Sequence, residues 1–276
     1  MNVQEARQVD IAAYLMERGV ALKRSGRRYK HPEHDSLVFT GNAYFWNSRG
    51  EHGNAVDYLV RHYSMDFKTA VAELTKENFA GQGKKVEDPE PFTFSEIKTT
   101  ANLRRGIAYL TKTRGISSDI VQRLIKDKLM FLEADTNNLI FPMYDEGGAV
   151  VGAEKQGTLS RYRFKGVAAG SKYGYGYNIR MSESLKYALF FESAVDMLSY
   201  WQLAKKAFTG CLLVSVAGLK SNVIKHLTVV FGGLQPVLCV DNDPAGREFA
   251  DSYKNVIKRF PMPPAKDWNE QISLVQ

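Results

Sequence analysis

The C-terminal third of the chain alternates short apolar runs with segments of helical periodicity. YALFFE, CLLVSVAG and PVLCVDND are strand-like, and each is followed by a helix-like segment, namely AVDMLSYWQLAKKAF, NVIKHLTVVFGG and GREFADSYKNVIKRF. Strands that are almost wholly apolar and separated by helices predict a parallel sheet covered by helices on both faces. In such sheets functional groups collect beyond the carboxyl ends of the strands.

Carboxylates stand at these strand ends. Glu192 ends the first strand, and Asp241 and Asp243 follow the third. Carboxylates that lie this close raise one another's proton affinity unless a cation compensates them, and hard oxygen ligands suit Mg²⁺ or Mn²⁺. An extended backbone would point Asp241 and Asp243 to opposite faces, so we expect the chain to turn at Asn242. A purely structural alternative is that Asp243 caps the helix that begins near Pro244.

Composition is that of a soluble protein with a basic surface. The 276 residues amount to about two domains by length, with 44% hydrophobic and 24% charged residues. No apolar run approaches the ~18 residues that span a bilayer, and no signal region follows Met1, so we expect a cytoplasmic protein without a membrane partner. The net charge of +7 favours an anionic partner such as nucleic acid, although a solvated basic surface without a dedicated partner is an alternative. Cys211 and Cys239 lie in apolar runs, where we expect them to be buried.

The chain divides into three folded parts. We expect an α+β module over residues 1–79, a linker over 80–99, a second α+β part over 100–182, and the α/β domain over 183–276. AGQGKKVEDPEPFTFSE is rich in Gly, Pro and charge, which is typical of a linker. In the second part, NNLIFPMYDEGGAVVGAEKQG predicts a hairpin that turns at DEGG.

The last domain resembles the Toprim domain, the catalytic fold that bacterial primases, topoisomerases and some nucleases share. FFESAVDMLSYW, VDNDPAGR and AKDWNE carry this resemblance. The glutamate after the first strand and the Asp-x-Asp after the third are the signature of the family, and their order and spacing match here. The ESxxD form and the KDWNE ending resemble the Toprim branch carried by plasmids and conjugative elements.

The resemblance implies roles for the acidic and basic residues of the last domain. It implies catalytic residues Glu192, Asp241, Asp243 and Lys266. It implies Mg²⁺ or Mn²⁺ ligands Glu192, Asp241, Asp243 and Asp267. It implies supporting residues Asp196 and Asn269 behind them. Lys266 would contact phosphate, although a structural loop anchored by Trp268 is an alternative interpretation of KDWNE.

The middle part is similar to the primase subdomain that precedes Toprim. The hairpin sequence and VAAGSKYGYGYN carry this similarity. It implies basic residues that face template and nucleotide, namely Arg161, Arg163, Lys165 and Lys172, together with Arg247 of the last domain. Gln156 stands where the family usually has an arginine, so either Lys155 substitutes for it or nucleotide contact is weakened.

The N-terminal module resembles the zinc ribbon at the front of bacterial primases, through HPEH, YFWNSRGEHGNAVDYL and FKTAVAEL. The ligand positions of the ribbon read His31, His34, Trp46 and Arg49. Because Trp46 and Arg49 are not zinc ligands, we expect no zinc. We expect an aromatic core instead, formed by Tyr29, Phe39, Tyr44, Phe45 and Trp46. The candidates for binding single-stranded DNA in this module are Arg27, Arg28, Lys30 and Arg49.

Together these resemblances imply a primase-like nucleotidyltransferase. It would synthesise short primers from NTPs on single-stranded DNA, in plasmid or mobile-element replication or transfer, with a helicase or relaxase supplied separately. The alternatives are a Toprim nuclease and a DNA-binding accessory protein with a catalytically idle site. Reaction products separate primase from nuclease, and metal titration separates both from the accessory protein.

Overall fold

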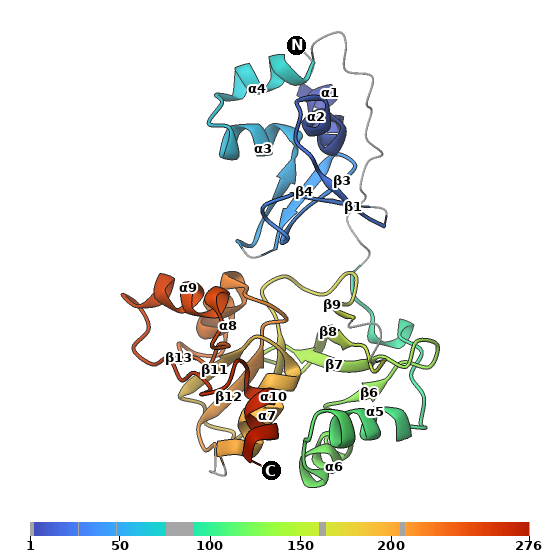
Figure 1. Ribbon diagram of the computed structural model, residues 1–276, viewed down its shortest axis with the longest axis vertical. Coiled ribbons are helices and arrows are strands. Elements are labelled where there is room, and N and C mark those ends of the chain that lie inside the picture. The colour runs from blue at the N-terminus through green and yellow to red at the C-terminus, as the bar shows by residue number, and fades with distance from the viewer. Residues whose placement is uncertain are drawn as a thin grey trace. The chain divides into compact units, whose positions relative to one another are not determined.

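The computed structural model describes residues 3–26, 28–47, 49–75, 91–159, 164–204 and 208–275. The chain forms two compact units, Met1–Asp88 and Pro89–Gln276, and each is described by itself (Figure 1). Within the described ranges no helix has both the length and the apolar character that crossing a membrane requires.

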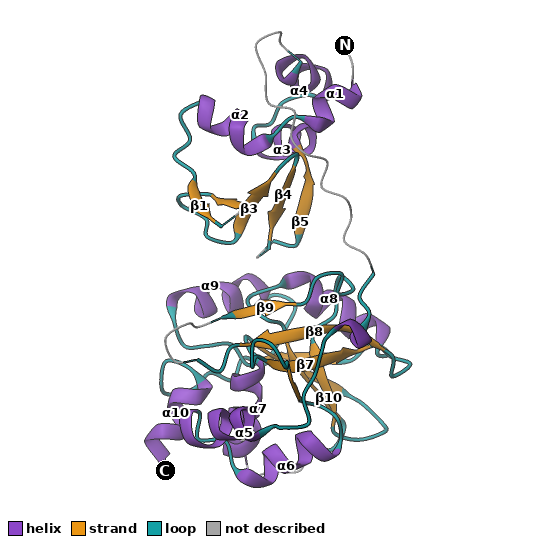
Figure 2. Cartoon of the chain, turned by 90° about the vertical axis from the view of Figure 1, so that its right-hand side faces the viewer, coloured by secondary structure: helices purple, strands orange, loops and turns teal. Residues whose placement is uncertain are grey.

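The first unit is built on an antiparallel sheet with the strand order β1-β2-β3-β4-β5. Its strands are β1 (Lys23–Ser25), β2 (Arg28–Lys30), β3 (Leu37–Thr40), β4 (Ala43–Trp46) and β5 (Glu51–Asn54). Its helices, purple in Figure 2, are α1 (Val3–Gln8), α2 (Ile11–Glu17), α3 (Ala55–His62) and α4 (Phe67–Leu74). Asp10 and Asn54 begin α2 and α3 by accepting hydrogen bonds from backbone N–H groups of the first turn.

Aromatic side chains fill the core of the first unit, as expected. Phe39 and Tyr44 are fully buried, Trp46 is nearly so, and all three pack in one cluster with Tyr58 of α3. Phe45 is the exception, because strand residues alternate between faces and Phe45 lies between two inward-facing residues. It is 37% exposed, so its assignment to the core was wrong.

The second unit begins with an antiparallel sheet of order β6-β7-β8-β9. Its strands are β6 (Phe131–Leu132), β7 (Leu139–Tyr144), β8 (Val150–Gln156) and β9 (Lys165–Val167), and the helical segments near it are η1 (Phe94–Glu96), α5 (Arg104–Ala108), the π-helical η2 (Tyr109–Thr113) and α6 (Ser118–Lys126). The hairpin predicted around DEGG is the β7–β8 pair.

The expected linker is too long at its C-terminal end. Residues 76–90 lie outside the described residues, but residues 91–99 belong to the second unit. Phe92, Phe94 and Ile97 pack against the buried Ile140 and Ala153 of the antiparallel sheet. These apolar side chains gain burial that a solvated linker would not give them.

The last part of the chain forms a second sheet of order β10-β12-β11-β13. The strands are β10 (Tyr177–Arg180), β11 (Tyr187–Phe191), β12 (Cys211–Ser215) and β13 (Gln235–Leu238), and the helices are α7 (Ala194–Ala204), α8 (Ser221–Val230), α9 (Pro244–Tyr253) and α10 (Trp268–Val275). β11 pairs in parallel with both β12 and β13, whereas β10 adds an antiparallel edge strand.

Side chains on the central strand alternate between two apolar layers. Leu189 and Phe191 of β11 share a core with α7 and α10, which lie side by side (Figure 1). Ala188 and Phe190 share the opposite core with α8 and α9. The expected α/β domain with helices on both faces of a parallel sheet is therefore confirmed. Cys239 is buried as expected, but Cys211 at the start of β12 is only half-buried.

Trp268 fastens α10 to the sheet. Its Nε1 donates a hydrogen bond of 2.8 Å to the carbonyl oxygen of Cys239, and its ring meets Tyr200 edge-to-face with centroids 4.7 Å apart. Trp268→Phe leaves that buried carbonyl without its donor, so we expect the free energy of unfolding to fall by about 1–3 kcal/mol. Urea denaturation followed by circular dichroism measures the loss. The control is Trp201→Phe, and equal stability of the two variants would contradict the assigned role.

Candidate functional site

Two neighbouring strands bring Glu192 and Asp241 together. β11 and β13 are parallel neighbours with Phe190 opposite Leu238, so their carboxyl ends share one edge of the sheet. Glu192 follows β11 directly, Asp241 lies three residues beyond β13, and the Asp241 N–H donates a hydrogen bond of 3.2 Å to Glu192 Oε1. The strand ends therefore meet as the sequence predicted.

The chain turns at Asn242, and Arg247 holds that turn. Arg247 Nη1 donates hydrogen bonds of 2.8 Å to both the carbonyl oxygen and the Oδ1 atom of Asn242. The N–H of Asn242 in turn donates to the carbonyl oxygen of Lys266 at 2.8 Å. The KDWNE segment is thus bonded to the Asp-x-Asp turn. We expected Arg247 to contact nucleotide, but its Nη1 atom is engaged in hydrogen bonds to Asn242 of the same chain.

The carboxyl groups of the site lie close together and are partly buried. The pKa of Glu192 is raised to about 7, first by burial and then by the charges of Asp243 and Asp196, against the hydrogen bond from the Asp241 N–H. Burial also raises the pKa of Asp241 to about 8, with added contributions from Asp196, Glu192 and Asp267. At neutral pH these carboxyl groups therefore favour a proton or another cation beside them.

Asp241 offers a vacant acceptor to such a cation. Its Oδ1 atom is buried and has no hydrogen-bond partner, which is costly for a carboxylate oxygen. Among the described residues, no three of these carboxylates bring oxygen atoms within 4.8 Å of one another. Mg²⁺ takes one or two carboxylates directly and keeps several of its waters, so it does not require three carboxylate oxygens this close together.

Asp243 and Asp267 each cap a helix while facing the same site. Asp243 Oδ1 accepts a hydrogen bond of 2.9 Å from the Gly246 N–H at the start of α9. Asp267 Oδ1 accepts one of 2.7 Å from the Glu270 N–H at the start of α10. The structural alternative for Asp243 is therefore correct. It does not exclude metal binding, because a carboxylate has a second oxygen.

Asp196 and Asn269 lie behind the metal candidates. Asp196 is buried on α7, and its carboxylate accepts a short hydrogen bond from the Ser193 hydroxyl. Burial raises the pKa of Asp196, against this hydrogen bond and the nearby charge of Lys165. Asn269 Nδ2 donates to the carbonyl oxygen of Arg114 at 2.7 Å and to Ser199 Oγ at 3.0 Å. It therefore ties α10 to α7 and to the segment after η2.

The basic candidates differ in where they lie. Lys165 on β9 is close enough to Glu192 and Asp196 that its charge lowers the pKa of both. Lys172 is exposed, with its Nζ 5.0 Å from the centre of the Tyr175 ring. The side chain of Lys266 is also exposed. Arg161 and Arg163 lie outside the described residues.

Lys155, one candidate to replace the arginine expected at this position, forms an ion pair within the antiparallel sheet. It points away from the carboxylates and pairs with Glu133, Nζ to Oε1 at 2.7 Å. Gln156 is buried, and its Nε2 donates to the carbonyl oxygens of Gly157 at 3.1 Å and Phe164 at 3.4 Å. Of the two alternatives for this position, the pairing of Lys155 with Glu133 favours a weakened nucleotide contact.

Glu154 and Lys220 are near the site and were not identified from the sequence. Glu154 is fully buried on β8, and Lys220 at the start of α8 is close enough for the two charges to interact. Burial raises the pKa of Glu154 and lowers that of Lys220. An acidic residue inside the apolar strand pattern VVGAEKQ was the signal that could have identified Glu154.

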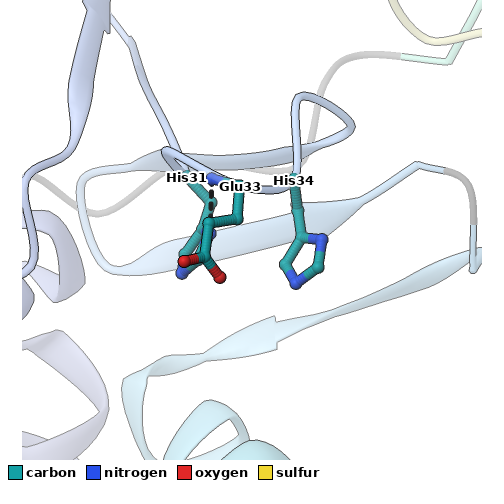
Figure 3. Close-up of side chains that lie close together, drawn as sticks. All are labelled: His31, Glu33 and His34. Carbon is teal, nitrogen blue, oxygen red and sulfur yellow. Dashed lines mark hydrogen bonds between the residues drawn. The ribbon is translucent and has the colours of Figure 1, made fainter.

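In the first unit, His31, Glu33 and His34 bring ligand atoms within 4.8 Å of one another (Figure 3). The Glu33 N–H donates a hydrogen bond of 3.3 Å to His31 Nδ1, drawn dashed in Figure 3. The His31 and His34 rings stack with centroids 5.0 Å apart, and His34 lies equally close to Trp46. Structural zinc sites almost always have four ligands, whereas this cluster offers three. The absence of zinc stays a prediction.

Arg49 and the β1–β2 hairpin hold the remaining DNA-binding candidates. The guanidinium of Arg49 lies over the Trp46 ring at 3.7 Å from its centre. Arg28 is exposed, and Lys30 lies directly opposite Lys23 in the antiparallel pair. Arg27 is outside the described residues. Like charges in such a pair repel, which favours an anionic partner at this hairpin.

Comparison with known families gives two matches in the second unit. Residues 108–184 match a family described as a protein of unknown function (DUF3991). Residues 189–272 match a family described as Toprim-like. The second match contains Glu192, Asp241, Asp243 and Asp267.

Two relatives match over nearly the whole chain. An uncharacterized protein of Bacillus anthracis, pXO2-78, is 31% identical over 273 residues, which cover 91% of this chain and 78% of the relative. A 65 kDa protein of Zymomonas mobilis subsp. mobilis is 25% identical over 309 residues, and the match covers 96% of this chain but 50% of that protein. Among solved structures, the zinc-binding and RNA polymerase domains of the Aquifex aeolicus primase align at 15% identity with a TM-score of 0.38, over 98% of this chain and 81% of that one.

Gly246 allows α9 to approach the Asp-x-Asp turn. A methyl group at this position would lie 2.2 Å from the Asp241 carbonyl oxygen and 3.2 Å from Glu192 Oε1. Gly246→Ala should therefore displace Asp241 and weaken Mn²⁺ binding at least about 10-fold, although no ligand is removed. Titration followed by electron paramagnetic resonance of free Mn²⁺ measures this. Gly147→Ala is the control, since its methyl group meets nothing nearer than Asp145 Oδ1 at 3.4 Å; wild-type affinity in Gly246→Ala would refute the prediction.

The raised pKa of Asp241 predicts how stability depends on pH without metal. The folded chain holds this proton up to about pH 8, whereas the unfolded chain releases it near the ordinary pKa of 3.8. The stabilisation is complete below the unfolded pKa and is lost as pH rises through about 8. Asp241→Asn cannot titrate, so from about pH 5 to pH 8.5 its unfolding temperature should rise relative to that of the wild type. Thermal unfolding in EDTA measures this, and parallel pH profiles would contradict it.

Proposed function

This chain belongs to one family with the Bacillus anthracis protein pXO2-78 and contains a Toprim-like domain, and we propose that it is a primase-like nucleotidyltransferase. It synthesises short primers from NTPs on single-stranded DNA. The process it serves is replication or transfer of a plasmid or mobile element, with a helicase or relaxase supplied as a separate protein.

The observation that carries the proposal is the meeting of Glu192 and Asp241 at adjacent strand ends. Two partly buried carboxyl groups with raised pKa values, one of them with an unpartnered oxygen, meet at adjacent strand ends. A divalent ion bound there would neutralise charge on the phosphates of a nucleotide. Glu192, Asp241 and Asp243 are the residues that hold it, and Asp267 completes the set.

The residues around the carboxylates orient the substrate. Lys165 lies on the side of Glu192 and Asp196, where a cation attracts the phosphates. Lys266 follows on the segment bonded to Asn242, so its exposed ammonium group projects from the same loop system. Arg247 keeps the turn between Asp241 and Asp243 in place through its two hydrogen bonds.

The N-terminal unit binds the DNA strand in this proposal. Lys23, Lys30 and the exposed Arg28 lie on one hairpin, and Phe45 is exposed two strands away, opposite His52. Lysine and arginine side chains neutralise phosphates, and aromatic rings stack on bases.

A DNA-binding accessory protein is the second candidate. Lys155 is paired with Glu133 and Gln156 is buried, so the position of the family's arginine supplies no cation to a nucleotide. An accessory protein would bind single-stranded DNA and yield neither primers nor nicked DNA.

Primer synthesis on single-stranded DNA tests the proposal. Purified protein is incubated with NTPs and Mg²⁺ or Mn²⁺, and labelled products are separated by size. We expect short oligonucleotides, and Asp241→Ala should reduce their yield at least about 100-fold because the metal ligand is lost. Asp251→Ala, which removes an exposed carboxylate on α9, should retain activity.

The same assay separates the alternatives. Nicked template without new oligonucleotides would identify a nuclease. DNA binding without either product would identify the accessory protein. Primer synthesis that survives in Asp241→Ala would show that the site is assigned to the wrong residues.

A further inference from the structure

Glu154 is a buried carboxylate that the proposed chemistry does not use. It lies on β8 and is 2% exposed. Its neighbours Ala153 and Lys155 face the antiparallel sheet's own small core and Glu133. Because side chains alternate along a strand, Glu154 faces the opposite way, toward the Toprim sheet.

Both oxygens of Glu154 accept hydrogen bonds from the Toprim domain. Oε1 accepts from the N–H of Ala194 at 3.1 Å, and Oε2 accepts from Ser215 Oγ at 2.6 Å. Ala194 is the first residue of α7, two positions after Glu192, and Ser215 is the last residue of β12. Glu154 therefore contacts the carboxyl ends of two neighbouring strands, β11 through the turn that follows Glu192 and β12 through Ser215.

The two segments are also bonded to each other around Glu192. The N–H of Val216 donates to the carbonyl oxygen of Phe191 at 2.9 Å, and the N–H of Gly218 donates to that of Glu192 at 2.8 Å. Ala217 between them has φ of +50°, a strained conformation for a residue with a side chain. Surrounding contacts must hold such a loop in place, and its Ala217 N–H donates to Ser215 Oγ at 3.4 Å.

Burying a carboxylate is unfavourable unless hydrogen bonds and charges compensate it. Glu154 has both, since two donors face its oxygens and the charges of Lys165 and Lys220 lie nearby. Lys165 also lies near Glu192 and Asp196. Glu154 is thus linked to the acidic cluster by backbone hydrogen bonds and by a shared lysine.

We propose that Glu154 is a positioning residue of the metal site, which holds the Glu192–Ala194 turn and the end of β12 so that the Glu192 carboxylate faces Asp241. The inference rests on the proposed function only in taking Glu192 as a metal ligand. It assigns to the middle part of the chain a direct role in the geometry of the Toprim site.

Three variants and two measurements test this role. Glu154→Ala removes the acceptor, whereas Glu154→Gln can accept from Ala194 through its amide oxygen and donate to Ser215 Oγ through its amide nitrogen. Glu133→Gln is the control, because it changes a carboxylate of the same sheet that pairs with Lys155. The measurements are Mn²⁺ affinity by electron paramagnetic resonance and amide hydrogen exchange of residues 191–196 without metal.

We expect Glu154→Ala to weaken Mn²⁺ binding by about 10- to 100-fold and to accelerate exchange at Ala194. We expect Glu154→Gln to restore most of the affinity and protection, and Glu133→Gln to behave as the wild type. Circular dichroism verifies that each variant is folded. Wild-type affinity and exchange in Glu154→Ala would overturn the inference, and so would a Glu154→Gln variant as defective as Glu154→Ala.

Primer synthesis by the same proteins separates this inference from the proposed function. Failure of every protein to make primers, with Mn²⁺ affinity still dependent on Glu154, would refute the primase and leave the positioning role intact. Full primer synthesis by Glu154→Ala with unchanged affinity would refute the positioning role alone.

Discussion

Mutual repulsion among partly buried carboxylates is the constraint around which the second unit is arranged. Glu192 and Asp241 are brought to adjacent strand ends by the parallel pairing of β11 with β13, and burial makes their charges costly there. Hydrogen bonds compensate part of this cost. The Asp241 N–H donates to Glu192, and backbone N–H groups at helix N-termini donate to Asp243 and Asp267. The buried Oδ1 atom of Asp241 receives no hydrogen bond from the described residues.

Much of this arrangement could be predicted because it follows from local patterns. Apolar runs separated by helical segments predicted the parallel strands, and the order of Glu192 and Asp241 along the chain placed them at the ends of those strands. The register of alternating side chains was harder to infer. This register turns Phe45 outward. It also directs Lys155 to Glu133, whereas the neighbouring Glu154 faces the Toprim sheet.

Long-range contacts could not be predicted, because they join residues far apart in the sequence. Residues 91–99 read as a linker from their Pro and charge content, yet Phe92 and Phe94 pack on the sheet that β7 and β8 form. Likewise nothing local to Asn269 indicates that it bonds the Arg114 carbonyl, 155 positions away. Such long-range contacts hold residues 91–275 together within one compact unit.

The aromatic core of the first unit has a chemical consequence of its own. His34 and Arg49 pack on Trp46, and the two cysteines of the chain are both beyond residue 200. Thiolates are the groups that peroxide and disulfide-forming reagents attack. The first unit has no cysteine, so disulfide formation cannot alter it, and its methionines, such as the exposed Met16, are the side chains that peroxide can oxidise.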